Sequence, residues 1–371
     1  MTSHPAWIEV DLDQFRKNLE AIRKRIGSRK LCLPVKANAY GHGLVQMSLA
    51  AEWFGVDVLA VSCLQEGIEL RRAGIRLPIL VLGAIHEEQI GQLLEEELEF
   101  SLSSRFKAQL VGKLCREMGK VARVHLEVDT GINRTGMRPE TALALFEELQ
   151  QEKCFWIQGI YSHFATSDEP NDPFAKKQIA AFSEVRKRVD KAGLVWHLAN
   201  SGGVYYYPES YFDMVRPGLL CYGLTPDGKE DPEIKPCFSL RAKISYFKVV
   251  GAGEGISYSR LYVTKEETRV ITVPVGYGDG FPRNLSNLAP ILHRGSRYQV
   301  AGRICMDQCM VDIGQHEGFV GETVTLLGRD GGEEISLWEL ARLAHTDPRE
   351  ILCRFNNRLP RRYGQERVKL R

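Results

Sequence analysis

Several reactive or anion-binding side chains lie after or within short apolar runs of the chain. They comprise an amine, an imidazole, a hydroxyl and two guanidinium groups: Lys36, Arg134, His163, Ser201 and Arg216. A lysine amine can act as a nucleophile and an imidazole can carry a proton, whereas guanidinium groups bind carboxylates and phosphates. Each residue alone would mean little, since a lysine after a strand is usually a solvated charge. Together they predict a site for an anionic substrate or cofactor.

Two glycine-containing segments accompany these side chains. They are Ser201-Gly202-Gly203 and Pro217-Gly218-Leu219. Because glycine carries no Cβ, a phosphate can come close to the backbone N–H groups of such segments. Tyr40 adds a phenol donor close to Lys36 in the sequence. Most glycine pairs are simple turns, so the two segments indicate phosphate binding only in combination with the reactive residues.

The elements that must position these groups alternate between strands and helices from residue 11 to residue 230. The clearest helix covers Leu12 to Ile26, where apolar residues recur at intervals of three and four. Alternating strands and helices favour an α/β fold of parallel units, and eight units close a (β/α)8 TIM-type barrel. The eight strand-like runs are Leu31–Val35, Asp57–Val61, Ile79–Leu82, Glu99–Leu102, Ala122–Val128, Phe155–Tyr161, Val195–Leu198 and Asp213–Tyr222.

The barrel interpretation explains the positions of the reactive groups, because active sites of such barrels lie at the C-terminal ends of the strands. Lys36 follows the first run, Arg134 follows the fifth and His163 ends the sixth. Ser201 follows the seventh run, and Arg216–Gly218 lie within the eighth. The loops after the last two strands often bind phosphate in these barrels. We therefore expect all of these groups at one rim.

From residue 231 to residue 371 the pattern changes to short strand-like segments separated by glycine-rich turns. It predicts a mostly antiparallel β domain that ends in a helix around Leu337–Ala344. The short run Trp7–Val10 has no evident barrel partner. We therefore expect residues 1–10 to join residues 231–371 in the second domain, and residues 11–230 to form the barrel.

Composition excludes several classes of function. The 371 residues carry a formal net charge of only +2, which argues against nucleic acid as a partner. No apolar stretch is long enough for a membrane span, and no secretory signal is visible. The nine cysteines form no CxxC pair, so we expect thiols in a cytoplasmic, reducing compartment. We expect no metal site.

Taken together, these segments resemble the alanine racemase family over nearly the whole chain. The strongest segment is VKANAYGHG at residues 35–43; HLANSGG, DMVRPGLLCYGLTP, ISYSRLY, GYGDGFPR and GRICMDQCMVDIG follow in the family's order. The resemblance implies a pyridoxal 5'-phosphate (PLP) enzyme that racemises alanine. The D-alanine that this family produces usually feeds peptidoglycan synthesis. It also implies a head-to-tail homodimer in which each active site borrows Tyr258 and the loop Cys305–Asp307 from the other subunit.

The resemblance assigns roles by motif. Lys36 carries PLP and serves as one base, and Tyr258 serves as the other. His163 lies beside the cofactor ring and contacts Arg216 and Tyr258. The groups expected to bind the cofactor are Lys36, Tyr40, His163, Asn200, Ser201, Arg216, Gly218, Leu219 and Asn357. The groups expected to bind the substrate carboxylate, support the site or line the access passage are Arg134, Met306, Glu127, Asp307, Arg303, Asp168 and Arg283.

The implied roles fit the chemistry of racemisation. A Cα proton must leave one face and return to the other, so two proton carriers are needed, while PLP withdraws electrons. A phenol with its ordinary pKa of about 10 is a poor base, so nearby cations must favour the phenolate. Arginine at the pyridine nitrogen can only donate a hydrogen bond, which disfavours transamination.

Two positions depart from the family pattern. Glu127 occupies a position that often holds a carbamylated lysine, and we expect its carboxylate to orient Arg134; an outward-facing strand glutamate is the alternative. Asn357 replaces a tyrosine that caps the pocket, which predicts a roomier site and some serine racemisation. If another side chain such as Tyr363 fills the gap, alanine specificity survives.

Other functions remain open from the sequence. They are a serine or broad-specificity racemase, a PLP-dependent decarboxylase, and a PLP carrier without catalysis. The arginine at the pyridine nitrogen and the segments ISYSRLY and CMDQ favour racemisation over decarboxylation. The second domain argues against a carrier, which would resemble the barrel alone.

Overall fold

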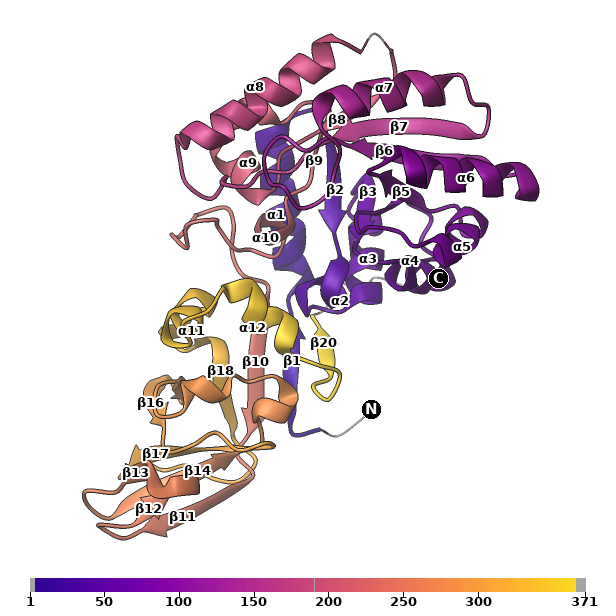
Figure 1. Ribbon diagram of the computed structural model, residues 1–371. Coiled ribbons are helices and arrows are strands. Elements are labelled where there is room, and N and C mark those ends of the chain that lie inside the picture. Colours follow the sequence, from indigo (N-terminus) through magenta and orange to yellow (C-terminus); the bar gives the residue numbers. More distant parts are fainter. Residues whose placement is uncertain (1–3, 190, 365–371) are drawn as a thin grey trace. The chain divides into compact units, whose positions relative to one another are not determined.

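The computed structural model describes residues 4–189 and 191–364, which divide into two compact units. One unit comprises the described residues of 14–39 and 44–236. The other comprises the described residues of 4–13, 40–43 and 237–364 (Figure 1). No helix within these described ranges has the length and apolar character needed to cross a bilayer.

The first unit is a closed barrel of eight parallel strands, as the alternating sequence pattern predicts. Each strand pairs with its neighbours in chain order, and β2 closes the barrel against β9 through the pairs Lys30–Met214 and Leu31–Val215. The strands are β2 (Lys30–Pro34), β3 (Val58–Val61), β4 (Ile79–Val81), β5 (Glu99–Leu102), β6 (Ala122–Glu127), β7 (Phe155–Tyr161), β8 (Val195–His197) and β9 (Met214–Val215).

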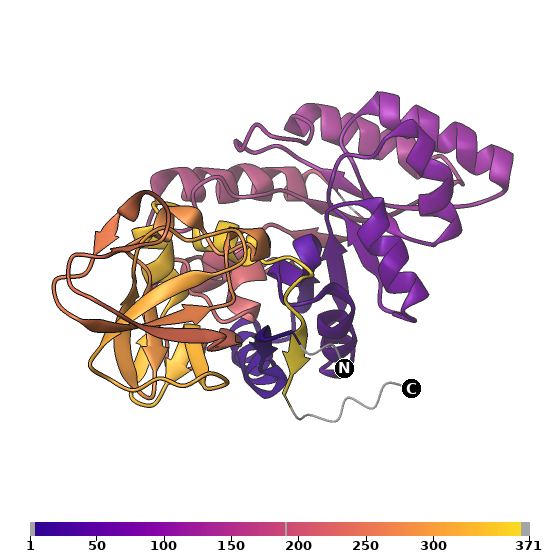
Figure 2. The ribbon, with the colours of Figure 1, turned by 90° about the horizontal axis from the view of Figure 1, so that it is seen from below.

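Helices surround the strands on the outside of the barrel (Figures 1 and 2). The first helix begins and ends where the apolar spacing predicts, and side-chain oxygens cap later helices, for example Asp172 at the N-terminus of α8. The helices of this unit are α1 (Leu12–Ile26), α3 (Leu44–Trp53), α4 (Leu64–Arg72), η1 (Glu87–Gln89), α5 (Ile90–Glu95), α6 (Arg105–Met118), α7 (Pro139–Gln150), α8 (Pro173–Lys187), α9 (Ser201–Tyr206), η2 (Pro208–Ser210) and α10 (Gly218–Cys221).

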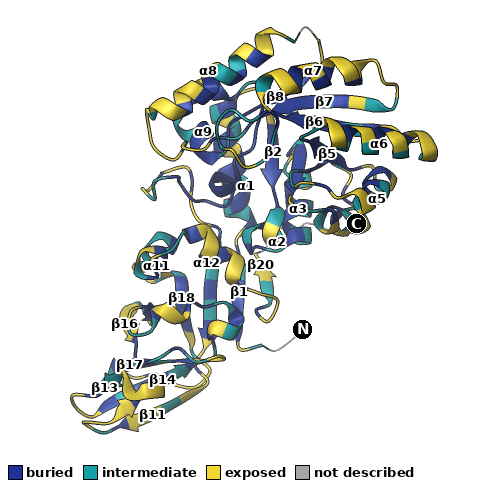
Figure 3. Cartoon of the chain, viewed as in Figure 1, coloured by how far each residue is buried: buried dark blue, intermediate teal, exposed yellow. Residues whose placement is uncertain are grey.

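Strands β3, β4 and β5 of the barrel are buried on both faces (Figure 3). This burial explains why they are continuous apolar runs rather than alternating ones. Cys32, Val58, Ala60, Leu80 and Met214 form one buried cluster. Complete burial of a side chain such as Val58 or Leu80 contributes about 1.5–3 kcal/mol, so the cluster holds the ring of strands together.

The eighth strand is much shorter than the apolar run Asp213–Tyr222 predicts. Strand β9 covers only Met214–Val215, and Gly218–Cys221 form the short helix α10 instead. Arg216–Gly218 therefore lie after the strand, and our prediction that they lie within it is wrong. Proline at 217 has no N–H to continue the sheet ladder, and the chain turns there into the helix.

The segment after β2 adopts a rare left-handed helical turn, α2 (Lys36–Tyr40). The φ angles of Ala37, Asn38, Ala39 and Tyr40 are 53°, 56°, 52° and 51°. Left-handed backbone costs roughly 1–2 kcal/mol for each non-glycine residue. Hydrogen bonds stabilise the turn: Ala39 N–H donates to the Val35 carbonyl at 2.7 Å, and Leu44 N–H donates to Asn38 Oδ1 at 2.8 Å.

The second unit is built on a ten-stranded sheet in the order β11-β14-β17-β16-β15-β18-β10-β1-β20, with β19 paired to β18. As expected for a strand without a barrel partner, β1 pairs with β10. The strands are β1 (Ala6–Val10), β10 (Phe238–Lys243), β11 (Tyr246–Val250), β14 (Thr268–Val273), β15 (Pro290–His293), β16 (Ser296–Val300), β17 (Cys309–Gly314), β18 (Thr323–Asp330), β19 (Glu333–Ile335) and β20 (Arg361–Tyr363).

All pairings of this sheet are antiparallel except that of β1 with β20. The expected helix is present as α11 (Leu337–Leu343), and the sequence pattern missed α12 (Pro348–Arg354) and β20. A small hairpin joins β12 (Gly255–Ile256) to β13 (Tyr262–Val263). The short helix η3 (Tyr258–Arg260) lies between its strands.

The left-handed turn predicts an unusual response to glycine. Ala37 is exposed, so Ala37→Gly removes almost no buried surface and relieves the backbone strain. We expect the free energy of unfolding to rise by about 0.5–1 kcal/mol in urea denaturation. Ala144 is an exposed residue inside the right-handed helix α7 and serves as the matched control. Ala144→Gly should lower the same quantity by about 1 kcal/mol. Destabilisation by both substitutions would contradict the assigned strain.

Candidate active site

The reactive residues of the first unit lie after the C-terminal ends of barrel strands. Lys36 lies two residues beyond β2, His163 two beyond β7, and Arg216 one beyond β9. Ser201 begins α9, which follows β8, and Arg134 lies in the loop between β6 and α7. The closed barrel therefore brings these residues to the same end of its strands, as the sequence interpretation requires.

Arg216 is the most deeply enclosed charged group of this rim, with only 3% of its surface exposed. Its Nη1 contacts His197 Nδ1 at 2.6 Å, and its Nη2 donates to the Ser162 carbonyl at 2.7 Å. Nη2 also lies 3.3 Å from the Leu198 carbonyl and 3.3 Å from His163 Nδ1. Four acceptors thus fix the guanidinium plane. Nη1 makes only one of these contacts among the described residues, so its second hydrogen can be donated to a ligand.

His163 is held neutral by its surroundings. Burial lowers its pKa well below the ordinary value, and the positive charges of Arg216, Arg134 and Lys36 lower it further. The side chain of Gln178 donates to the His163 carbonyl at 3.0 Å and fixes the backbone there. A neutral imidazole whose Nδ1 faces a guanidinium presents Nε2–H as a donor.

Behind Arg216 lies a row of buried polar side chains that the sequence analysis did not identify. His197 Nε2 lies 2.9 Å from His125 Nδ1, and His125 Nε2 lies 3.0 Å from Glu99 Oε2. Tyr161 stacks on His197 with ring centroids 5.0 Å apart, and its hydroxyl lies 2.6 Å from Ser101 Oγ. A histidine inside an apolar strand was the available sequence signal, since HLEV and VWHL each place one there.

The left-handed turn that carries Lys36 is anchored by Glu66, another residue that the sequence did not single out. Glu66 accepts the Ala37 N–H at 2.7 Å through Oε1 and the Ser62 N–H at 2.8 Å through Oε2. One carboxylate thus ties the turn to the segment that follows β3. Because Ala37 directly follows Lys36, this hydrogen bond restricts the position of the Lys36 backbone from which the side chain extends.

Two short helices form a backbone cradle at the same rim. Asn200 caps α9, because its Oδ1 accepts the Gly203 N–H at 3.0 Å and the Ser167 hydroxyl at 2.8 Å. The Ser201 hydroxyl accepts the Leu220 N–H of α10 at 3.2 Å, which joins the two helix starts. The first N–H groups of a helix have no intrahelical acceptor, so two joined helix starts suit a phosphate.

Glu127 lies at the end of β6 and is only 4% exposed. Its Oε1 accepts the Thr135 hydroxyl at 2.8 Å. Burial raises the pKa of this carboxyl, while Thr135, Tyr161 and the charge of Arg134 oppose the rise. Arg134 itself is exposed. The pair therefore combines an inward carboxylate with an outward guanidinium that can still bind a ligand.

In the second unit, Tyr258 begins the short helix η3 and is 68% exposed. The backbone around it is strained, since Ser257, Ser259 and Arg260 have φ angles of 65°, 60° and 47°. The Ser257 hydroxyl donates to the Arg303 carbonyl at 2.6 Å. Strained backbone of this kind persists only where the surrounding structure over-determines it, and the Ser257 hydrogen bond is one such restraint beside Tyr258.

The loop that carries Met306 is fixed by the neighbouring turn Tyr277–Asp279. Gly278 N–H donates to the Met306 carbonyl at 2.8 Å, and a Cβ at Gly278 would lie 2.9 Å from that oxygen. Arg358 bridges the two segments, 2.7 Å from Asp307 Oδ1 and 3.2 Å from Asp279 Oδ1. Arg358 is another positioning residue that sequence reasoning missed.

The remaining predicted residues occupy separate positions. In the barrel unit, Asp168 is exposed between β7 and α8; Leu219 is buried in α10. In the second unit, Arg283 and Asn357 are exposed, and Arg303 is half-buried. The Tyr363 hydroxyl donates to the His42 carbonyl at 2.9 Å, and a Cβ at Gly43 would lie 1.9 Å from the Tyr363 hydroxyl oxygen. Tyr363 therefore packs on the segment Tyr40–Gly43 of the second unit.

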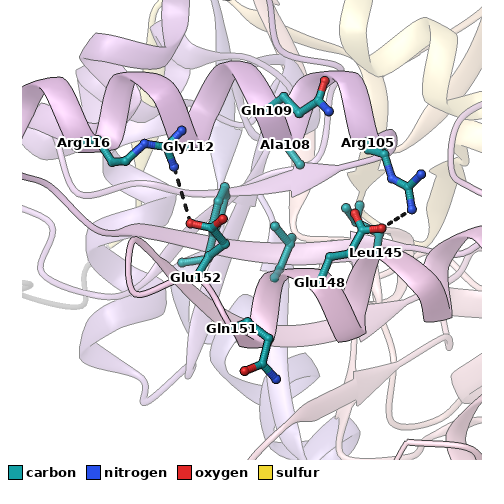
Figure 4. Close-up of a pocket in the computed structure, with 11 residues that line it drawn as sticks. Arg105, Ala108, Gln109, Gly112, Arg116, Leu145, Glu148, Gln151 and Glu152 are labelled. Carbon is teal, nitrogen blue, oxygen red and sulfur yellow. Dashed lines mark hydrogen bonds and ion pairs between the residues drawn. The ribbon is translucent and has the colours of Figure 1, made fainter.

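A pocket of about 450 Å³ lies elsewhere on the barrel, between α6 and α7 (Figure 4). Two ion pairs cross it, Arg105 with Glu148 and Arg116 with Glu152. Phe155 lines it at the N-terminal start of β7. The described residues that line this pocket include none of the residues predicted for the active site.

The chain is similar to known proteins over nearly its whole length. Residues 10–226 match the family described as alanine racemase, N-terminal domain, and residues 237–363 match alanine racemase, C-terminal domain. An alanine racemase of Symbiobacterium thermophilum is 40% identical over 368 residues, which cover 98% of each chain. The crystal structure of alanine racemase from Streptomyces lavendulae has a TM-score of 0.92 and 35% identity, covering 98% of each chain. A histidine racemase of Leuconostoc mesenteroides has a TM-score of 0.92 and 28% identity, covering 98% of this chain and 99% of that one.

The lowered pKa of His163 predicts a pH dependence of stability. Below pH 6.5, the ordinary pKa of histidine, the unfolded chain binds a proton at residue 163 that the folded chain does not bind. The free energy of unfolding therefore decreases as the pH is lowered. The loss approaches, but stays below, about 1.4 kcal/mol per pH unit because His163 is only half-buried. Urea unfolding between pH 7.5 and 5.5 measures it. His163→Gln should show a shallower slope than the unmodified chain, and equal slopes would contradict a depressed pKa.

Proposed function

Because the chain belongs to the alanine racemase family, it is a PLP-dependent isomerase, and we propose that it moves the Cα proton of alanine between Lys36 and Tyr258. The observation that carries this proposal is the buried Arg216 beside neutral His163, on the barrel rim that also carries Lys36. We further propose that Tyr258 comes from the partner subunit of a cytoplasmic homodimer and that D-alanine serves peptidoglycan synthesis.

The residues of the first unit fit PLP. The joined starts of α9 and α10 offer backbone N–H groups to a phosphate, and Arg216 offers a fixed N–H donor. Lys36 follows β2 on a turn anchored at Ala37. When bound, PLP withdraws electrons from the substrate and acidifies its Cα proton. We assign phosphate contacts to Tyr40, Ser201, Gly218 and Leu219, and support of the cofactor to Asn200 and Asn357.

Arg216 limits the kind of chemistry that the site performs. A guanidinium is effectively never deprotonated, so towards a ring nitrogen it can only donate a hydrogen bond. Its four protein acceptors keep it from turning away from that role. We infer that a ring nitrogen held in this way stays unprotonated. Racemisation is then favoured over transamination and over decarboxylation.

The two bases serve opposite faces of the substrate. Lys36 holds or receives a proton on one face, and the phenol of Tyr258 of the partner subunit does so on the other. Neutral His163 lies between that phenol and Arg216, and we expect the positive charge of Arg216, relayed through His163, to favour the phenolate. Arg134 and the Met306 N–H bind the substrate carboxylate, while Asp168, Arg283 and Arg303 line the passage to it.

Sharing of sites between subunits can be tested with two inactive variants. Lys36→Ala and Tyr258→Phe should each lose at least about 10²-fold in alanine racemisation, because each lacks one proton carrier. Co-expression should produce hybrid dimers that contain one intact site. Random pairing then restores about a quarter of the activity of the unmodified protein. Chiral chromatography of the products measures this.

The control is co-expression of two differently tagged copies of Lys36→Ala, which should remain inactive. If each site were complete within one subunit, the mixed variants would also stay inactive. Single variants give a second check. Tyr258→Phe should still exchange the Cα hydrogen of one alanine enantiomer with deuterium from solvent, and exchange of both enantiomers would contradict the assignment of Tyr258.

We propose that Glu127 replaces the carbamylated lysine common in the family and orients Arg134 electrostatically. Its carboxylate is buried, accepts the Thr135 hydroxyl and acts on Arg134 through charge. Thr135 follows Arg134 directly, so the bond to Thr135 also restrains the loop. A carboxylate built into the chain would make the site independent of bicarbonate.

Glu127→Gln removes this charge but keeps an acceptor for Thr135. We expect the KM for alanine to rise about tenfold with a smaller change in kcat, because a charge-assisted contact is worth about 1.5 kcal/mol or more. Steady-state kinetics with both enantiomers give the two constants. Glu140→Gln, at an exposed carboxylate in the first turn of α7, is the control and should change neither. An unchanged KM in Glu127→Gln would exclude the orienting role.

We propose that Asn357 leaves room for serine beside alanine. Asparagine is smaller than the tyrosine usual at this position and offers both a donor and an acceptor. Tyr363 is engaged with the His42 carbonyl, which argues against its filling the space. The similar fold of a protein named histidine racemase supports the idea that this architecture accepts polar side chains.

Asn357→Tyr tests this preference. We expect the ratio of kcat/KM for L-serine to that for L-alanine to fall about tenfold, as a filled pocket discriminates by size. The kcat/KM for alanine of the same variant is the internal control and should remain within about threefold. Serine turnover below background in the unmodified protein would reject the proposal, while alanine racemisation would stand.

A further inference from the structure

Two buried histidines connect the carboxylate of Glu99 to the guanidinium of Arg216 across the interior of the barrel. The links are Arg216 Nη1 to His197 Nδ1 at 2.6 Å, His197 Nε2 to His125 Nδ1 at 2.9 Å, and His125 Nε2 to Glu99 Oε2 at 3.0 Å. Exposed fractions are 3% for Arg216, 0% for His197, 3% for His125 and 7% for Glu99. Glu99, His125 and His197 belong to strands β5, β6 and β8, respectively. Arg216 directly follows β9.

The two ends of this row determine where every proton lies. Arginine only donates, so His197 Nδ1 must accept and His197 Nε2 must carry the hydrogen. His125 Nδ1 then accepts from His197, and His125 Nε2–H donates to Glu99. A proton on Glu99 Oε2 would reverse the row and leave two donors facing each other at Arg216. The arrangement therefore requires two neutral imidazoles and a Glu99 Oε2 that accepts the hydrogen bond from His125.

We propose that Glu99 is the relayed counter-charge of Arg216 and that His125 and His197 are positioning residues that hold the guanidinium in one orientation. Burying a charge without a partner is costly, and the cost is reduced when an opposite charge and a full set of hydrogen bonds accompany it. The row provides both, because each of its members donates or accepts in one direction from Arg216 to Glu99.

Other charges near Arg216 do not replace this row. Glu127 is a carboxylate whose charge acts directly on Arg216, but its described hydrogen bond goes to Thr135 and not to the guanidinium. Arg134 is a like charge and opposes Arg216. Burial lowers the pKa of His197 well below its ordinary value, and the charge of Arg216 lowers it further, in keeping with a neutral imidazole. Glu99 is thus the carboxylate that accepts the last hydrogen bond of the row that begins at Arg216.

The consequence for catalysis rests on the proposed function. A guanidinium fixed through Nη1 presents a constant donor to the cofactor ring, whereas a loosened one could rotate about its side-chain bonds. Disorder of 1 Å in such a group reduces the rate strongly, because the electrostatic environment must be preorganised. Glu99 touches neither cofactor nor substrate in this account, so its effect reaches the site only through Arg216.

Nuclear magnetic resonance of the holoenzyme with 15N-labelled histidine tests the row directly. We expect His125 and His197 to be neutral Nε2–H tautomers at pH 8, with signals assigned by His125→Asn and His197→Asn. Glu99→Gln should shift the Nε2–H signals of both histidines, since the charge at the end of the row is lost. Glu95→Gln, an exposed carboxylate near the end of α5, should shift neither. An Nδ1–H tautomer at His197, or a shift confined to His125, would overturn the proposal.

A double-mutant cycle in urea tests the charge coupling. Glu99→Gln should lower the folding equilibrium constant about a hundredfold, because it leaves a buried guanidinium without its relayed counter-charge. In an Arg216→Met background the same substitution should cost less than about tenfold. Equal costs in both backgrounds would mean that Glu99 is merely structural. If Glu99→Gln does not fold, the tautomers of the unmodified protein still decide the matter.

Kinetics separate this inference from the proposed function. Glu99→Gln should lower kcat for alanine with little change in KM, and Glu99→Asp should recover part of the loss. A protein that racemised no amino acid at all, yet showed the expected tautomers and coupling, would refute the proposed function alone. Normal racemisation with unchanged kcat in folded Glu99→Gln would refute the positioning role alone.

Discussion

The barrel interior must satisfy a guanidinium that is almost entirely removed from water, and much of the local structure follows from that constraint. Arg216 donates to the carbonyl groups of Ser162 and Leu198, which follow β7 and β8. A carbonyl that follows a parallel strand can point inwards only if the ladder ends there. Strand β9 ends at Val215, directly before Arg216, and Pro217 has no N–H to continue the ladder.

The strained turn after β2 has a comparable logic. Four consecutive left-handed residues cost several kcal/mol by the usual estimate per residue, so the surrounding structure must favour that conformation strongly. Glu66 supplies one restraint at Ala37, and Asn38 supplies another at Leu44. The turn shortens the path from β2 into α3 and starts directly after Lys36. A flexible loop there would let the lysine sample many positions.

The sequence predicted the barrel well, because parallel strands are buried on both faces and form continuous apolar runs. The same signal failed at Asp213–Tyr222, where a buried segment that contains the four-residue helix α10 is as apolar as a strand. Residues near Lys36, Ser201 and Arg216 were recognisable because reactive side chains follow strands. Glu66, Glu99 and Arg358 were not, since a glutamate in a helix or strand and an arginine in a loop gain their roles only from partners distant in the chain.

Tyr161 connects the two halves of the candidate site within the barrel. Its ring stacks on His197 at an angle of 8° between planes, and the Arg216 guanidinium lies 5.2 Å from its centroid. Its hydroxyl lies next to Ser101, and a hydrogen bond from the same hydroxyl lowers the pKa of Glu127. Through this one residue, the carboxylate beside Arg134 and the row behind Arg216 share a side chain. A change in charge at Glu127 must therefore be felt at Arg216, and the groups proposed to bind the substrate carboxylate and the cofactor ring form one electrostatic unit rather than two.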